Sequence, residues 1–364
     1  TMFSFVAYAL YLNRPSSTLN IIALSLFFLL LIQPTYLFQV GFQMSYAAVF
    51  AIVWLYPKLE AIWKPSPIVL RKLWQLLAVS CTAQLGVLPI SLFYFHQFPG
   101  LFFVSNLLIV PFLGLILGLG FLLVFLSNLS ILPEFLAHFY NSIIKIMNKT
   151  IAWIGKRDEF LFKEVPFDSF DLMLTYVIIF AIIFLAMHRT TKHLILALIS
   201  ILLLQTHTLI QLKKVKAKEQ FIIAHQTTNT LMLHQQGQLL TVYHRNNEAD
   251  NSVVPNFKIA ERIRSVSYTQ LQNSYRIGDK RLYVMDSLGI YPLNKVDYLL
   301  MTHSPKVNLE RVLDSVTVGM VLVDGSNYNS AVARWKTTCE KKEIPFHFTG
   351  EKGAFYFNRE FSLD

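Results

Sequence analysis

Long apolar runs separated by short polar turns occupy the first 212 residues of the chain. Leu, Ile, Phe and Val dominate them, and several runs approach the roughly 20 residues that a helix needs to cross about 30 Å of hydrocarbon. The pattern predicts about six membrane segments, at residues 19–32, 40–56, 73–95, 101–126, 170–187 and 194–212. The run 101–126 suits either one tilted helix or two broken pieces.

Residues 128–167 have a different pattern. Apolar positions recur there at helical spacing between Lys145, Lys149 and Lys156. Such spacing is typical of an amphipathic helix that lies in the membrane interface. We expect this interfacial helix at about residues 133–157.

From residue 213 onward, strand and helix patterns alternate as in a soluble domain. The strands are expected at 221–224, 231–234, 239–244, 281–286, 296–302, 320–324, 345–348 and 354–358, and the helices at 257–264, 308–316 and 328–342. This alternation predicts an α/β layered domain. The expected fold is therefore a polytopic helical membrane domain (residues 1–212) followed by a soluble α/β domain (residues 213–364).

Composition supports the membrane assignment and adds little else. The chain is 54% hydrophobic and 15% charged, whereas soluble proteins carry about 25% charged residues. The net charge of +10 suits anionic lipid, nucleic acid or solubility equally well. Cys81 and Cys339 lie in different kinds of segment, so no disulfide is expected. The run 1–12 lacks signal-peptide features, and we interpret it as the end of a membrane helix with further chain upstream.

Polar and helix-breaking residues interrupt the apolar runs, and these are the candidate channel residues. They are Gln43, Ser45, Gln84, Pro89, His96, Asn106 and Pro111. A side-chain amide inside the bilayer should face the bundle interior or a water-filled cavity. Broken helices around a polar midplane build transport paths. Each residue alone more often serves helix packing, but the cluster across two successive segments favours a function. The apolar runs lack a strongly charged pair, which argues against a proton-coupled pump.

In the soluble part, one histidine follows a strand and precedes a helix. A hydrolytic zinc site needs several imidazole and carboxylate ligands in such a loop, and the loop offers only His303. Asp286 and Asp324 end other strands, and His347 lies further along the chain. We therefore expect no metal site, no cofactor and no catalytic residue.

Three segments of the membrane part together resemble the ComEC-type family of DNA-internalisation proteins. They are residues 41–46 (GFQMSY) after Gln33-Pro34, residues 83–89 (AQLGVLP) followed by 95–100 (FHQFPG), and residues 105–111 (SNLLIVP). Their order and spacing resemble the membrane competence domain of that family over about residues 1–126.

Many members of this family end in a metallo-β-lactamase-like domain, and the last domain here looks like a degenerate version. The strand 296–301 resembles the one before the family's His-x-His-x-Asp-His motif, and His303 matches the first histidine. Pro305, Val307 and Asn308 stand where the second histidine, the aspartate and the third histidine belong. The resemblance therefore implies a domain without an intact metal motif, and a protein that is not an enzyme.

The function that the resemblance implies is conduction of single-stranded DNA across the bacterial cytoplasmic membrane in natural transformation. It also implies a soluble domain on the extracytoplasmic side. The expected partners are single-stranded DNA, membrane lipid and other DNA-uptake proteins, and assembly with further copies of the chain stays open. Two alternatives remain: a membrane-anchored metallohydrolase with an unusual metal site near His303, and a transporter of a small solute or lipid.

Overall fold

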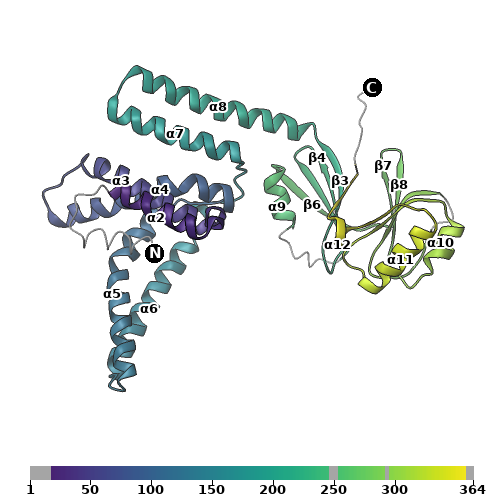
Figure 1. The fold of residues 1–364 in the computed structure, drawn as a ribbon, viewed down its shortest axis with the longest axis horizontal. Coiled ribbons are helices and arrows are strands. Elements are labelled where there is room, and N and C mark those ends of the chain that lie inside the picture. The colour runs from purple at the N-terminus through teal and green to yellow at the C-terminus, as the bar shows by residue number, and fades with distance from the viewer. Residues whose placement is uncertain (1–17, 246–252, 292–294, 358–364) are drawn as a thin grey trace. The chain divides into compact units, whose positions relative to one another are not determined.

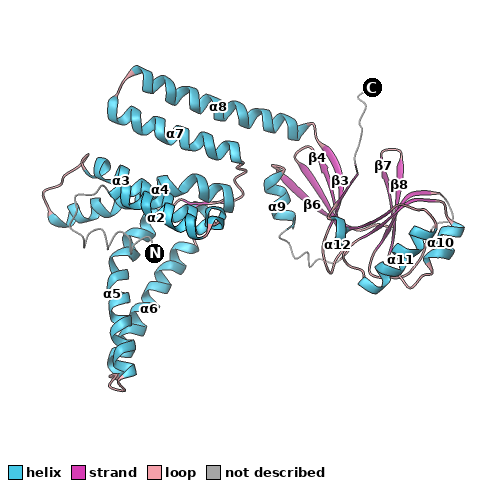
Figure 2. Ribbon diagram, in the orientation of Figure 1, coloured by secondary structure: helices cyan, strands magenta, loops and turns pink. Residues whose placement is uncertain are grey.

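The chain divides into two compact units, residues 1–205 and 206–364. A computed structural model describes residues 18–245, 253–291 and 295–357. Helices make up most of the first unit, and the strands of two sheets gather in the second (Figures 1 and 2). The run 1–12, which we interpret as a helix end, lies outside the described residues.

The helices of the first part follow the predicted segments closely. They are α2 (Thr18–Ile32), α3 (Val40–Glu60), α4 (Ile68–Phe95), α5 (Phe102–Asn128), α6 (Glu134–Gly155), α7 (Ser169–His188) and α8 (Thr191–Lys216), with the 3₁₀ turns η1 (Pro34–Phe38) and η2 (Asp158–Phe160). Five described helices, α3, α4, α5, α7 and α8, are long and apolar enough to cross a membrane. The sixth predicted segment, α2, has only 15 residues. The chain is thus a multi-pass membrane protein with a soluble α/β part.

Helices α3 and α4 approach each other closely at Gly86. A Cβ atom built on Gly86 would lie 2.5 Å from the Ala47 carbonyl oxygen and 2.6 Å from the Ala51 Cβ. Helices α5 and α6 form an antiparallel hairpin (Figure 1), in which a Cβ on Gly120 would lie 2.9 Å from the Tyr140 hydroxyl. Small residues therefore set the helix spacing at these two contacts.

A two-stranded ladder joins two loops of the membrane unit. Strand β1 (Phe98–Pro99) follows α4 and pairs antiparallel with β2 (Leu161–Phe162), which follows α6. The Gly100 amide donates to the Phe160 carbonyl over 2.7 Å. The sequence pattern did not predict this ladder, because two-residue strands leave no periodicity to read.

The second unit contains two five-stranded sheets. One has the order β12-β3-β4-β5-β6 and the other β11-β10-β9-β8-β7. Their strands are β3 (Glu219–Ala224), β4 (Leu231–Gln236), β5 (Leu239–His244), β6 (Ser265–Gln270), β7 (Ser274–Ile277), β8 (Lys280–Met285), β9 (Val296–Met301), β10 (Val318–Val323), β11 (Phe346–Phe348) and β12 (Phe355–Phe357). The helices of this unit are α9 (Val253–Ala260), α10 (Leu309–Ser315), α11 (Asn329–Lys341) and α12 (Thr349–Lys352).

These elements stack in four layers, because the side chains of each strand alternate between the two faces of its sheet. Phe221 and Ile223 of β3 pack between the sheets against Leu300 of β9, whereas Ile222 faces the core under α9. On the other sheet, Leu299 faces a third core with residues of α10 and α11. Successive side chains of a strand point to opposite faces, so both sheets are covered on both sides. The order of layers is helix, sheet, sheet, helix, as expected for an α/β layered domain.

The structure adds two strands to the predicted set and moves one helix. Strands β6 and β7 were not predicted, because β6 is polar and largely exposed at a sheet edge and β7 has only four residues. The helix expected at 257–264 begins earlier, at Val253, and ends at Ala260. Residue 358 of the last predicted strand lies outside the described residues.

Candidate functional site

Two polar candidates lie at the start of α3, and they have different surroundings. The Gln43 side-chain amide donates to the Leu37 carbonyl of η1 over 2.7 Å. Ser45 is exposed. Gln43 therefore braces the turn between η1 and α3, which is a local structural role.

The amides of Gln84 and Asn106 are the candidates that keep free hydrogen-bonding groups. Both side chains are half-buried, and among the residues that the structure describes neither has a hydrogen-bond partner. Gln84 lies in the middle of α4, and Asn106 lies in the second turn of α5. No hydrogen bond between described residues brings the two together into one site.

Pro89 and Pro111 lie inside helices that continue through them. Helix α4 runs without a break past Pro89, which is buried, and α5 runs past Pro111, which is exposed. Of the two alternatives for the run 101–126, the structure shows a single helix. A proline removes a donor from the helix ladder. Close to Pro89, the Gly86 carbonyl accepts the Tyr176 hydroxyl of α7 over 2.8 Å.

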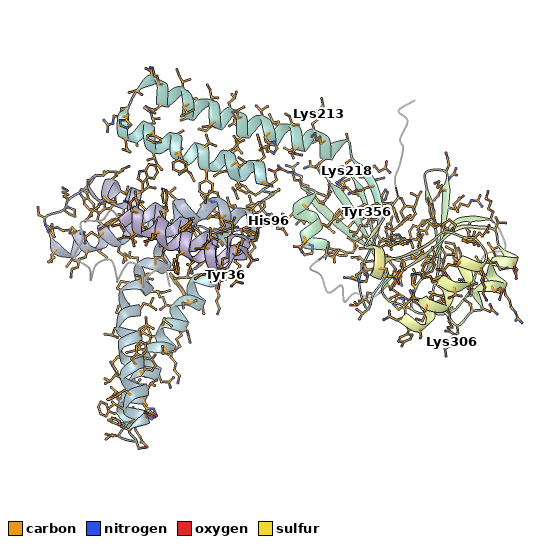
Figure 3. All side chains as sticks on the ribbon, viewed as in Figure 1. Tyr36, His96, Lys213, Lys218, Lys306 and Tyr356 are labelled. Atoms are coloured by element: carbon orange, nitrogen blue, oxygen red, sulfur yellow. The ribbon has the colours of Figure 1, made fainter. Side chains whose placement is uncertain are left out.

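His96 is the residue that follows α4, and it lies two residues before strand β1 of the ladder. Its backbone is left-handed (φ 53°), and its carbonyl accepts the Val165 amide over 2.9 Å. Its Nδ1 lies 3.2 Å from the Val165 carbonyl oxygen. These contacts fix the turn at the end of α4 (Figure 3) and give His96 a positioning role.

A cavity of about 420 Å³ opens between α2, α3, α4 and α7. Tyr46, Trp54, Gly86 and Tyr176 line it together with aliphatic side chains. The Tyr46 hydroxyl lies 3.1 Å from the Ser25 hydroxyl, and the Tyr176 hydroxyl is bonded to Gly86. An apolar lining whose hydroxyls are already engaged does not suit a chain of phosphates. Sequence reasoning missed Tyr176, although a tyrosine inside an apolar run is a visible signal.

The His303 loop is held in a strained backbone conformation. His303 and Ser304 follow β9 with φ values of 55° and 50°, a region that non-glycine residues rarely occupy. The Ser326 hydroxyl accepts the His303 amide over 2.8 Å, and the Asn327 side-chain oxygen accepts the Ser304 amide over 2.7 Å. The loop after β10 therefore fixes the loop after β9.

Asp324 is the buried centre of this hydrogen-bond network. Its carboxylate accepts the Ser326 amide over 3.1 Å and the Asn327 side-chain amide over 2.9 Å. It also accepts the hydroxyls of Ser326 and Thr230, and Thr230 precedes β4 of the other sheet. Complete burial raises the pKa of Asp324 to about 6, although these hydrogen bonds favour the charged form.

The residues around His303 do not fit a catalytic metal. Among the described residues, no group of three His, Cys, Asp or Glu ligands gathers around His303. Asn308 caps α10 by accepting the Glu310 amide over 3.0 Å, and Pro305 and Val307 offer no side-chain ligand. The nearby carboxylates are engaged, Asp324 in its network and Asp286 with Arg245. We therefore assign no metal-dependent hydrolysis to this loop.

The structure places the Arg245 guanidinium close to His303, a neighbour that the sequence did not predict. Its Nη2 lies 3.0 Å from the Asp286 carboxylate. Burial and the Arg245 charge lower the pKa of His303 below its ordinary value, while Asp286 raises it. Within the described residues, Nη1 of Arg245 and Nδ1 of His303 are buried without a hydrogen-bond partner. Burial and the Arg245 charge therefore favour the neutral form of the His303 imidazole. No pattern in the sequence places Arg245, which follows β5, beside it.

Comparison with known proteins agrees with both parts of the chain. Residues 1–192 match the family model described as competence protein, and residues 221–359 match the model of the ComEC C-terminal domain. ComE operon protein 3 of Bacillus subtilis (strain 168) is 43% identical over 91 residues, which are 25% of this chain and 11% of that protein. The chain therefore matches about a tenth of the length of this relative. No solved structure matches the chain. By its match over more than half of its length, the chain belongs to the competence protein family.

Proposed function

We propose that this chain is a channel component that conducts single-stranded DNA across the bacterial cytoplasmic membrane in natural transformation. The observation that carries the proposal is the match of residues 1–192 to the competence protein family. That part of the chain holds four of the five helices that are long and apolar enough to cross a membrane, and α8 begins just before its end.

The unpartnered amides of α4 and α5 support a polar path through the membrane. A buried amide without a partner costs free energy unless water or a ligand satisfies it. Gln84 and Asn106 are half-buried in apolar helices, and no described residue bonds their side chains. A water-filled path beside these amides would satisfy them, and a strand of phosphates needs such a path.

The proposal gives the two parts of the chain different tasks. Residues 1–212 form the channel domain, in which the amphipathic α6 lies in the membrane interface. Residues 213–364 form a domain outside the cytoplasm that binds and does not hydrolyse, because the ligand set around His303 does not fit a metal. Other DNA-uptake proteins deliver the strand, and membrane lipid surrounds the helices.

Substitution of the two amides tests the channel directly. Gln84→Ala and Asn106→Leu are expected to lower DNA uptake several-fold at unchanged membrane levels of the protein, because each removes a polar group from the path. Gln97→Ala, in the turn after α4, and Asn128→Leu, at the exposed end of α5, are the matched controls. Internalised labelled DNA and immunoblots of membranes give the readouts. Normal uptake in both test variants would indicate that the two amides serve helix packing and not DNA conduction.

The metallohydrolase alternative makes a separate prediction. A hydrolase at the His303 loop would bind a divalent metal in a ratio near one per chain, and His303→Ala would remove that metal. We expect metal analysis of the purified chain to give the same content in wild type and His303→Ala. A metal that is lost only with His303 would restore this alternative.

A further inference from the structure

One end of the two-sheet unit holds an aromatic pocket that the His303 loop does not share. Strand β9 runs toward His303, and β8 is parallel to β9. The turn before β8 therefore lies at the other end, together with the start of β3. A pocket of about 140 Å³ opens there between the sheets, and its lining includes Phe221, His234, Tyr243, Tyr275, Arg276 and Phe357.

The walls of this pocket are aromatic rings from both sheets. The rings of Phe221 and Tyr243 are stacked with centroids 6.0 Å apart, and Tyr243 meets Tyr275 edge-on at 5.0 Å. Phe357 closes the group at 5.6 Å from Phe221. Phe221 and Phe357 are buried and back the pocket, while the half-buried Tyr243 and Tyr275 offer ring surface to a planar ligand. Tyr275 is held at the pocket wall, since its hydroxyl accepts the Gln272 amide over 2.7 Å.

The rim of the pocket is polar and includes one exposed cation, Arg276 of the β7–β8 hairpin. Lys280 of the same hairpin donates to the Tyr298 hydroxyl over 3.2 Å. The Arg276 side chain is 78% exposed, and its contact with the fully exposed Asp279 is long at 3.8 Å. An exposed pair of this kind contributes little, so the guanidinium can reach a phosphate. On the β3–β4 side, Glu219 and His234 lie 3.4 Å apart and offer hydrogen bonds to the edge of a ring.

The size and chemistry of the pocket select one class of ligand. Pockets for whole small molecules begin at roughly 300 Å³, so this pocket suits one planar ring system and not a complete nucleotide. Proteins that bind single strands without reading their sequence combine cations along the backbone with aromatic side chains on which bases stack. A base inside a duplex cannot enter such a pocket.

We propose that this pocket binds one base of single-stranded DNA, while Arg276 contacts an adjacent phosphate. The inference rests on the proposed function and gives the soluble domain a binding role in it. The last membrane-spanning helix, α8, ends at Lys216, and β3 begins at Glu219. The pocket thus belongs to the end of the domain at which the chain leaves that helix.

Binding of a fluorescein-labelled oligothymidylate to the full chain in detergent micelles tests the inference. Ile277 lines the pocket and packs, partly buried, against the core between the sheets. Ile277→Phe keeps an apolar side chain there and adds volume that would fill the pocket. We expect Ile277→Phe to weaken binding by roughly 5- to 150-fold, since stacking of one base contributes about 1–3 kcal/mol. Arg276→Ser should weaken binding at low salt and reduce the slope of log affinity against log salt by about 0.7, the value for one phosphate contact.

Two control variants separate the pocket from the rest of the surface. Tyr356 is labelled in Figure 3 and lies beside Phe357 on β12, but its side chain is 55% exposed on the other face of the sheet. Lys306 is an exposed cation of the His303 loop at the opposite end of the unit. Tyr356→Ala and Lys306→Ser are expected to bind within about twofold of wild type, because neither side chain lines the pocket. Thermal unfolding of every variant shows that the fold is retained.

Three results would overturn the inference. The first is equal affinity of wild type and Ile277→Phe, which would leave the pocket empty of DNA while the proposed function stands. The second is equal affinity for an abasic strand or a blunt duplex of the same length, because only phosphates would then be bound. The third is loss of binding in Lys306→Ser alone, which would place the strand at the His303 loop. Uptake assays in cells test the proposed function separately.

Discussion

At the scale of single residues, Gly86 and Asp324 show how each unit is held. Gly86 lets α3 and α4 approach, and its carbonyl receives the Tyr176 hydroxyl. Asp324 collects donors from two loops, the one after β10 and the one before β4. The absence of three motif ligands after His303 could be read from the sequence, since it concerns residue types. The partners of Gly86 and Asp324 could not, because each contact joins segments far apart in the chain.

Gly86→Ala should destabilise the membrane unit. The added Cβ would lie 2.5 Å from the Ala47 carbonyl oxygen, and backbone cannot move aside as a side chain can. Overpacking of this kind costs about 1–3 kcal/mol, and we expect the melting temperature in detergent to fall by several degrees. Gly118→Ala in α5 is the matched control, since its Cβ would meet no atom within 4 Å. Equal melting temperatures for the two variants would contradict the close helix contact.

Asp324 should give the soluble unit a stability that falls with rising pH. Its folded pKa of about 6 lies above the ordinary value of 3.8, so folding takes up a proton between these values. The contribution of Asp324 is therefore fully present below about pH 4 and is lost as the pH rises through about 6, a change on the order of 3 kcal/mol. Thermal melts at pH 4 to 7 should show a shallower decline in Asp324→Asn. Parallel curves for both proteins would contradict the buried acid.

At the scale of elements, the apolar pattern along the chain predicted the ends of the described membrane helices to within five residues. It did so because the bilayer thickness imposes one length on all of them. It failed at β1 and β2, where two residues carry no period, and at β6, whose polar side chains lie at a sheet edge. It also left open whether residues 101–126 form one helix or two, and the structure shows one.

The contribution of one N-terminal helix cap to stability can be tested at α10. Asn308 accepts the Glu310 amide over 3.0 Å at the start of this seven-residue helix. Asn308→Ala should lower the free energy of unfolding by about 1 kcal/mol, whereas Asn308→Asp should preserve it, because aspartate also accepts from the first turn. Chemical denaturation of both variants measures the difference. If both variants lose the same stability, Asn308 matters for another reason than its cap.

At the scale of the whole molecule, the chain combines a helical membrane unit with a two-sheet unit whose described residues offer no fitting metal site at His303. The resemblance that indicated a DNA-internalisation family rests on segments in α3, α4 and α5, and the family match covers residues 1–192. The candidate site was only partly predictable: Gln84 and Asn106 were named from their polarity, but their unpartnered state needed the structure. The aromatic pocket was not predicted at all, because its rings come from β3, β4, β5, β7 and β12.

The most direct test of the central claim compares labelled DNA in cells with and without this gene. Surface-bound and protected cytoplasmic DNA are scored separately, together with transformation frequency. If the chain is part of the DNA channel, DNA should still reach the cell surface in the deletion strain, while cytoplasmic DNA and transformants should be lost. Cytoplasmic uptake at the wild-type level would contradict the channel, and a different transported substrate would then have to be sought.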